Sequence, residues 1–210
     1  MTSFDRYYGR SSPAFGGEPS SEVCGIVPGR VPENSPALDL GCGDGRNSLF
    51  LAARGFQVTA VDSSQVGVTR LLERARREGL ERHLQGIVAD VCEWDYPRAR
   101  YDLIIAITIL DHLPAEAIGG VCARLLDSAR PGATVLVKVH TVADPGYRGV
   151  VSDKSELADA IEHYFEPGEL RKLLKDCCRL DYYEERRELD TSHGEPHHHG
   201  FAIARAVKVE

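Results

Sequence analysis

The sequence predicts an α/β domain in which helices cover both faces of a seven-stranded, mostly parallel sheet, a three-layer sandwich. Short apolar runs alternate with helix-forming segments from residue 36 to about residue 178, as in chains that fold strand by helix by strand. A glycine cluster follows the first apolar run, where open parallel sheets bind ligands. No helix separates the last two apolar runs, so they predict an antiparallel pair in which the final strand is reversed.

The individual elements follow from their boundaries. Apolar runs predict strands at 37–40, 56–62, 85–90, 101–108, 133–140, 180–189 and 201–209. Intervening segments predict helices at 46–54, 64–79, 114–130 and 167–178. Ser64 is a plausible N-cap for the second of these helices, and Gly55 and Gly79 end the first and the second.

Composition narrows the functional classes. The 210 residues suit one domain, and the net charge of -7, with no run of five basic residues, argues against a nucleic-acid partner. No apolar stretch is long enough to span a membrane, and the first residues do not resemble a signal peptide. Six cysteines without a C-x-x-C pair indicate reduced thiols. We therefore expect a cytoplasmic monomer or homodimer.

Two segments lack a clear strand or helix pattern. Residues 1–35 are rich in Gly, Pro and Ser, which predicts an irregular arm or lid before the domain at 36–210. Residues 142–164 form an insertion whose structure the pattern does not predict.

The loop after the first strand reads DLGCGDG, residues 39–45. Alternate glycines let the backbone approach a ligand closely. The dinucleotide fingerprint G-x-G-x-x-G would require glycine at position 46, where this chain has Arg46. Asp39 would attract the ammonium of a methionyl group and repel a pyrophosphate. The loop therefore favours S-adenosylmethionine (SAM).

Two further acids end neighbouring strands. Asp62 ends the second predicted strand, where a carboxylate can accept hydrogen bonds from both ribose hydroxyls. Asp90 ends the third, where an adenine amino group would lie. The alternative is that each acid only caps the turn that follows it, a common role for Asp.

The stretch ALDLGCGDGRNSLFLAARGFQVTAVDSS resembles motifs I and II of class I SAM-dependent methyltransferases, which have a Rossmann-like fold. Within that superfamily, GCGDGRNSLFLA, FEPGELRKLL and the C-terminal hairpin resemble the tellurite-resistance and thiopurine methyltransferase-like group. The resemblance covers about residues 36–209 and implies that the N-terminal arm covers the cofactor. It also implies contacts to SAM from Gly41, Cys42, Gly43, Arg46, Asn47, Asp62, Ser63, Asp90, Val91 and Ile107.

The segment after the fourth strand gives information about the methyl acceptor. The N/D-P-P-Y/F signature of many nucleic-acid and protein amide methyltransferases is absent here, and so is a Pro-Cys nucleophile. Both absences point toward small acceptors. Asp111 and His112 could act as acid or base, although a hydrogen-bonded residue at a helix start is the alternative for His112.

The histidine-rich segment TSHGEPHHHGF, residues 191–201, is expected to form the loop between the last two strands. Because the sixth strand should be parallel to the first five, this loop would emerge at the ligand edge of the sheet. His193 and His197 are then candidate bases for an acceptor, and His193 matches the tellurite-type relatives best. A solvated turn or a metal site are the alternatives. No acid or Cys partner is obvious in the sequence, so we expect no metal.

The residues together predict a SAM-dependent methyltransferase for a small thiol, chalcogen oxyanion or hydroxyl acceptor. Two alternatives stay open. One is a nucleotide-dependent oxidoreductase on the same sheet, and the other is a non-catalytic regulator that binds SAM or a metal.

Overall fold

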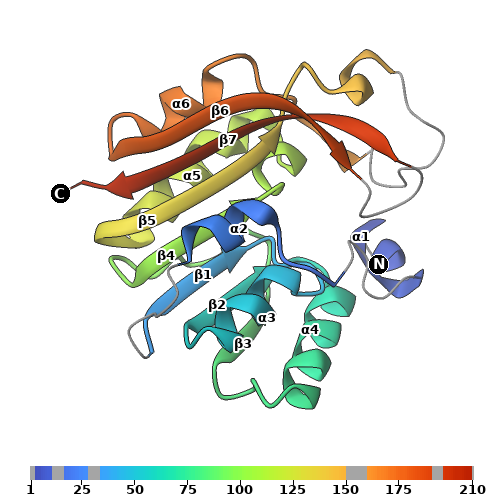
Figure 1. Cartoon of the computed structure of the whole chain (residues 1–210), viewed down its shortest axis with the longest axis vertical. Coiled ribbons are helices and arrows are strands. Elements are labelled where there is room, and N and C mark those ends of the chain that lie inside the picture. The colour runs from blue at the N-terminus through green and yellow to red at the C-terminus, as the bar shows by residue number, and fades with distance from the viewer. Residues whose placement is uncertain (1–2, 11–16, 28–33, 150–159, 191–195, 210) are drawn as a thin grey trace.

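A computed structural model describes residues 3–10, 17–27, 34–149, 160–190 and 196–209. Helices pack on both faces of one twisted sheet, as Figure 1 shows. Within the described residues, no helix is both long and apolar enough to cross a lipid bilayer.

The sheet has the strand order β3-β2-β1-β4-β5-β7-β6. Strands β1 to β5 are parallel, whereas β7 is antiparallel to both of its neighbours, β5 and β6. Strand β6 therefore points the same way as the first five, as predicted, and its carboxyl end lies at the ligand edge. The strands are β1 Pro36–Leu40, β2 Gln57–Asp62, β3 Leu84–Val88, β4 Tyr101–Ile107, β5 Ala129–His140, β6 Cys178–Asp190 and β7 His197–Lys208.

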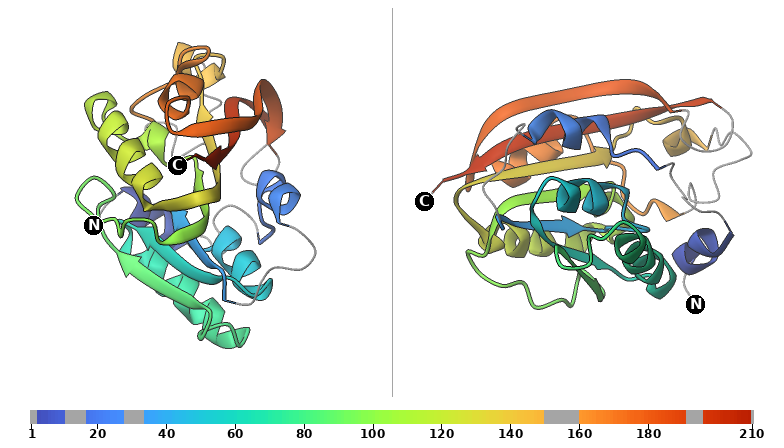
Figure 2. Two further views of the ribbon diagram at one scale, coloured as in Figure 1. Left: turned by 90° about the vertical axis from the view of Figure 1, so that its left-hand side faces the viewer. Right: turned by 60° about the horizontal axis from the view of Figure 1, so that its bottom comes forward.

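Each face of the sheet has its own hydrophobic core. Side chains of α2, α3 and α4 pack on one face, and those of α5 and α6 on the other, so the three predicted layers are confirmed (Figure 2). Ser64 caps α4 as predicted, because its hydroxyl accepts a hydrogen bond from the Gly67 amide at 3.1 Å. The helices are α1 Ser3–Arg10, α2 Ser21–Ile26, α3 Arg46–Ala53, α4 Gln65–Arg77, α5 Ala115–Ser128 and α6 Glu169–Leu174, with short 3-10 turns η1 Leu110–His112 and η2 Pro145–Arg148.

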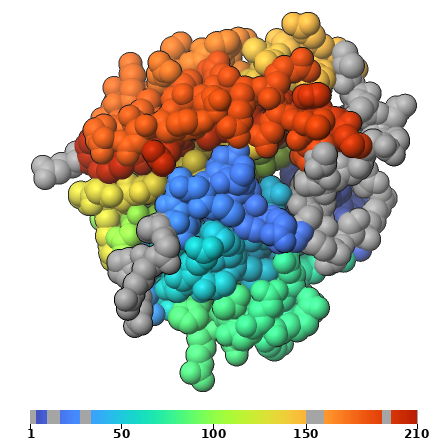
Figure 3. Space-filling model, viewed as in Figure 1, coloured from blue at the N-terminus to red at the C-terminus, as the bar shows by residue number. Residues whose placement is uncertain are grey.

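The N-terminal arm differs from the expectation of an irregular segment. It contains helices α1 and α2, which the Gly- and Pro-rich composition concealed. Helix α1 lies at the ligand edge of the sheet, whereas α2 fills the surface between α3 and the β6–β7 hairpin, as Figure 3 shows. Whether residues 1–35 form a unit separate from 36–210 stays a prediction.

Three other boundaries are corrected. Strand β3 ends at Val88, two residues before Asp90. Helix α6 is confined to Glu169–Leu174 because β6 already begins at Cys178. The residues His197–Gly200 belong to β7 and not to a loop, since their backbone pairs with β6. In the insertion 142–164, the described part holds η2.

Candidate active site

The glycine loop between β1 and α3 adopts backbone angles that side chains disfavour. Gly41 and Gly45 have φ values of +74° and +89°. A Cβ at Gly41 would lie 2.6 Å from Ile109 Cβ, and one at Gly45 would lie 2.1 Å from Leu71 Cδ1. The glycines thus allow both the turn and the close packing of the segments around it.

Asp62 anchors this loop from the end of β2. Its Oδ2 accepts a hydrogen bond from the Gly43 amide at 2.8 Å, and its Oδ1 accepts one from the Ser64 amide at 2.8 Å. Burial raises the pKa of Asp62, while the two backbone hydrogen bonds oppose the rise. The predicted ribose carboxylate therefore lies directly beside the loop.

Asp39 is enclosed beneath the same loop. It is 2% exposed, and its Oδ2 accepts a hydrogen bond from the Ser48 hydroxyl on α3. Burial raises the pKa of Asp39 to about 7; the Ser48 hydrogen bond opposes this rise and the charge of Asp62 adds to it. This carboxyl is therefore only partly ionised at neutral pH.

The other predicted cofactor residues fall into two groups. Cys42, Arg46, Asn47 and Ile107 line cavities next to the loop. Burial raises the pKa of the Cys42 thiol, so it stays protonated. The Asn47 side-chain oxygen accepts a hydrogen bond from the Ser20 amide at 2.9 Å and so ties the arm to α3.

The second group lines neither of these cavities. Ser63 and Asp90 are exposed, whereas Val91 is buried in the core. The Asp90 carboxylate accepts a hydrogen bond from the Cys92 amide at 2.8 Å. The turn-capping role considered for Asp90 is therefore present in the structure.

Helix α1 covers the glycine loop. A Cβ at Gly43 would lie 2.4 Å from the Tyr8 hydroxyl oxygen, so Tyr8 fills the space above this residue. Asp5 accepts a hydrogen bond from the Ser64 hydroxyl at 2.7 Å, and Phe4 contacts the His112 ring edge-on. These contacts hold α1 across the start of α4.

A cavity of about 70 Å³, here called the loop cavity, remains beneath α1. It is lined by Phe4, Tyr8, Gly41, Cys42, Gly43, Asp44, Arg46, Asn47, Ile107, Thr108 and His112. Pockets for ligands of cofactor size measure roughly 300 Å³ or more. The loop cavity alone is therefore smaller than a ligand of that size.

A second cavity of about 250 Å³, here called the hairpin cavity, lies beneath the β6–β7 hairpin. Its lining is Ser20, Ser21, Glu22, Arg46, Ile107, Thr108, Lys138, His140, Glu188, Leu189, Asp190, His199 and Phe201. Arg46, Ile107 and Thr108 border both cavities. The two spaces thus meet at the carboxyl end of β4.

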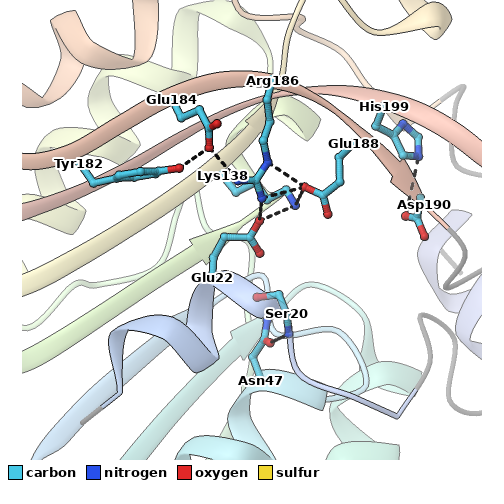
Figure 4. Close-up of polar contacts among 10 residues, drawn as sticks. All are labelled: Ser20, Glu22, Asn47, Lys138, Tyr182, Glu184, Arg186, Glu188, Asp190 and His199. Carbon is cyan, nitrogen blue, oxygen red and sulfur yellow. Dashed lines mark hydrogen bonds and ion pairs between the residues drawn. The ribbon is translucent and has the colours of Figure 1, made fainter.

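A network of buried and half-buried charges lies at the hairpin cavity (Figure 4). Lys138 lies 2.9 Å from Glu22 and 3.1 Å from Glu188, and Arg186 binds the same two carboxylates at 3.1 Å. Burial raises the pKa of Glu22, but the charge and hydrogen bond of Lys138, together with the charge of Arg186, lower the pKa overall. Within the described residues, Glu22 Oε2 has no hydrogen-bond partner and is itself buried. Charged side chains from α2, β5 and β6 thus line the wall of this cavity.

Two histidine–aspartate pairs reach the same cavity. His140, the last residue of β5, contacts the fully buried Asp111 through Nδ1. Burial opposes ionisation of Asp111, but the charge and hydrogen bond of His140 lower its pKa. His199 on β7 hydrogen-bonds through Nδ1 to Asp144 Oδ2 at 2.8 Å. The two carboxylates thereby fix the orientation of both rings.

The predicted catalytic histidines have different positions. His193 lies outside the described residues. His197 Nε2 lies 2.8 Å from His199 Nε2, but only His199 lines the hairpin cavity. His112 borders the loop cavity instead, and its Nδ1 lies 2.7 Å from the Ala160 carbonyl oxygen. That contact matches the structural alternative considered for His112.

Sequence reasoning missed His140, Glu22 and Lys138. The rule that identified Asp62, a polar residue at the carboxyl end of a parallel strand, applies equally to His140. By contrast, no sequence pattern signals the pairing of Lys138 with Glu22, because 116 positions separate them.

The chain is similar to a known family. A model of the family described as tellurite resistance protein TehB matches residues 20–198. A trans-aconitate 2-methyltransferase of Methylobacterium radiotolerans is 30% identical over 194 residues, which cover 90% of this chain and 70% of that protein. Hemagglutinin 1 of Eikenella corrodens is 32% identical over 152 residues, covering 70% of this chain and 45% of that protein.

Solved structures share the fold. TehB from Haemophilus influenzae has a TM-score of 0.72 at 21% identity, covering 99% of this chain and 68% of that chain. The chain spans about half the length of the curated relatives named hemagglutinin 1 and TehB.

Proposed function

Because the chain belongs to the TehB family of SAM-dependent methyltransferases, we propose that it methylates a small polar acceptor held in the hairpin cavity. The glycine loop and Asp62 form the cofactor site in this proposal. The observation that carries it is the junction of the two cavities at Arg46, Ile107 and Thr108. Methyl transfer requires two ligands whose reacting atoms nearly touch, and this junction allows that contact.

The residues near the loop fit the parts of the cofactor. Gly41 and Gly43 leave bare backbone on which a ligand can lie, and a Cβ at either position would collide with Ile109 or Tyr8. Asp62 offers a carboxylate to the ribose hydroxyls. Asp39 supplies negative charge for the methionyl ammonium. When bound, SAM supplies a methyl group on a positively charged sulfur, which is a good leaving group.

The protein then contributes orientation and the exclusion of water. Tyr8 and Phe4 on α1 line the loop cavity and would cover a cofactor bound there. Glu22 and Lys138 line the hairpin cavity, and their ion pair, with Arg186 bound to Glu22, holds them in fixed positions beside the acceptor. Preorganised positioning of this kind supplies a large part of the rate in two-substrate reactions.

The lining of the hairpin cavity supports a polar acceptor. Its lining includes charged side chains, Glu22, Lys138 and Asp190 among them, and these suit an acceptor that can exchange hydrogen bonds with them. A hydroxyl or oxyanion acceptor satisfies this lining better than an apolar thiol. The relative that methylates trans-aconitate by its name agrees with a small oxygen-containing acceptor.

The test has two parts. Calorimetry with S-adenosylhomocysteine measures whether the full chain binds the cofactor product, and NADH serves as the competing dinucleotide. Labelled SAM is then offered with a panel of hydroxyl, carboxylate, oxyanion and thiol compounds. We expect S-adenosylhomocysteine to bind and label to appear on an oxygen-containing acceptor. Binding of NADH alone, or binding without label transfer to any panel member, refutes the proposal.

A further inference from the structure

Three metal-ligand side chains converge beside the hairpin cavity. His140 at the end of β5, Asp144 before η2 and His199 on β7 each offer one ligand atom, and these atoms lie within 4.8 Å of one another. His140 and Asp144 are buried, and His199 is half-buried. Two imidazoles and one carboxylate are a common ligand set for divalent transition ions, with further positions left open.

Neighbouring groups hold the three side chains in place. The Asp111 carboxylate contacts His140 Nδ1 and accepts a hydrogen bond from the His140 amide at 3.2 Å. Asp144 accepts hydrogen bonds from the amides of Gly146 and Gly200 at 2.8 Å and 3.0 Å. A carboxylate behind a histidine ligand is the usual outer partner in metal sites, where it fixes the ring and raises its basicity.

The charge balance also favours a cation. Asp111 and Asp144 are both at least 96% buried, with exposed fractions of 0% and 4%. Within the described part of the chain, their ion pairs are with histidines and not with lysine or arginine. Among the residues that the structure describes, Asp111 Oδ1 has no hydrogen-bond partner and is buried. A divalent ion would offset this buried negative charge.

Two of the three candidate ligands border the hairpin cavity, where the acceptor is proposed to bind. His140 and His199 both line the hairpin cavity. His197, on the same face of β7, brings another ring nitrogen to 2.8 Å from His199 Nε2. An ion held by the three ligands would therefore have coordination positions directed toward a molecule in that cavity.

We propose that His140, Asp144 and His199 bind a divalent first-row transition ion, for which Zn²⁺ is the probe, and that this ion binds the acceptor through oxygen. The part of this proposal that concerns the acceptor rests on the proposed methyltransferase function. Coordination releases a hydroxyl proton to solvent and presents the oxygen as an anion, as metal ions do for bound water. The acceptor class is then an oxygen ligand, either a hydroxyl or an oxyanion.

Zinc binding by the full chain tests the site directly. Protein stripped with a chelator is titrated with Zn²⁺ in a calorimeter, and Co²⁺ is used in parallel because its visible absorption reports nitrogen and oxygen ligands. The wild type should bind one equivalent. His199→Ala and His140→Ala should each weaken binding by at least about 100-fold, and Asp111→Asn by about 10- to 100-fold.

His198→Ala is the matched control. His198 belongs to the same histidine run but alternates to the opposite face of β7 and is exposed, so its loss should change zinc affinity by less than about twofold. Equal zinc affinity in wild type and His199→Ala overturns the proposal. Tight zinc binding by His140→Ala also overturns the proposal, because the histidine run at 197–199 alone would then hold the ion.

S-adenosylhomocysteine affinity, measured on the same proteins, reports whether each variant is folded and separates the two proposals. Zinc binding without S-adenosylhomocysteine binding upholds the metal site and refutes the methyltransferase function. S-adenosylhomocysteine binding without zinc binding refutes only the metal site.

Discussion

The Asp39 carboxyl should make cofactor binding depend on pH. Its pKa of about 7, set mainly by burial, means that the group is largely protonated in mild acid. Only the ionised form attracts the methionyl ammonium, so affinity should rise as pH increases toward 7. At pH 5.5, about 1.5 units below the pKa, roughly 3% of the group is ionised, against about half at pH 7, which limits the loss of affinity over this interval to about 16-fold, or about 1.6 kcal/mol.

Calorimetry with S-adenosylhomocysteine between pH 5.5 and 7 measures this change. An α-amino group titrates at about 7.7–8.0, so the ligand stays cationic across the window. Asp39→Asn is the matched control, because its amide oxygen can still accept the Ser48 hydroxyl bond while the side chain cannot ionise. The variant should bind weakly and with a much smaller pH slope. Asp62, whose pKa is also raised, is present in both proteins and cannot explain a difference. Equal slopes in the two proteins refute the reasoning.

Three further changes probe the loop and its cover. Asp62→Asn removes the charge beside the loop and should weaken S-adenosylhomocysteine binding by about 10- to 100-fold in calorimetry. The control Asp102→Asn changes a half-buried acid that lines neither cavity and should have no effect on this affinity; equal affinities in the two variants contradict the role assigned to Asp62. Gly45→Ala should lower the free energy of unfolding by more than about 2 kcal/mol in denaturant titration. Gly132→Ala has a similar φ of +84° but open space around its Cβ, so a loss as large there would rule out the packing explanation. Tyr8→Ala should speed S-adenosylhomocysteine association in stopped-flow measurements, because α1 then closes the site less completely; an unchanged rate argues against α1 as the barrier.

Local sequence patterns predicted most of the fold and the part of the site that one loop builds. Apolar runs located the strands, and the strand-end rule placed Asp62 beside the glycine loop. The pattern failed in the arm, where α1 is stabilised by contacts such as Asp5 with Ser64, 59 positions away. Such contacts exist only after folding and leave no local periodicity.

The acid partners of the histidines were hidden for the same reason. The run at 197–199 seemed to lack a carboxylate, yet Asp144 lies 55 positions from its partner His199. Strand β7 inserts beside β5 and so brings the two together. Chain topology, and not sequence distance, therefore determines which acids face the histidines.

The end of β4 connects the two cavities through a strained residue. Thr108 has a φ of +50°, a conformation that costs a β-branched residue roughly 1–3 kcal/mol. Its amide donates a hydrogen bond to the Lys138 carbonyl at 2.8 Å, and this bond to the neighbouring strand helps to hold the turn. Because Thr108 borders both cavities, the turn that this strain accompanies lies where the proposed cofactor and acceptor would meet.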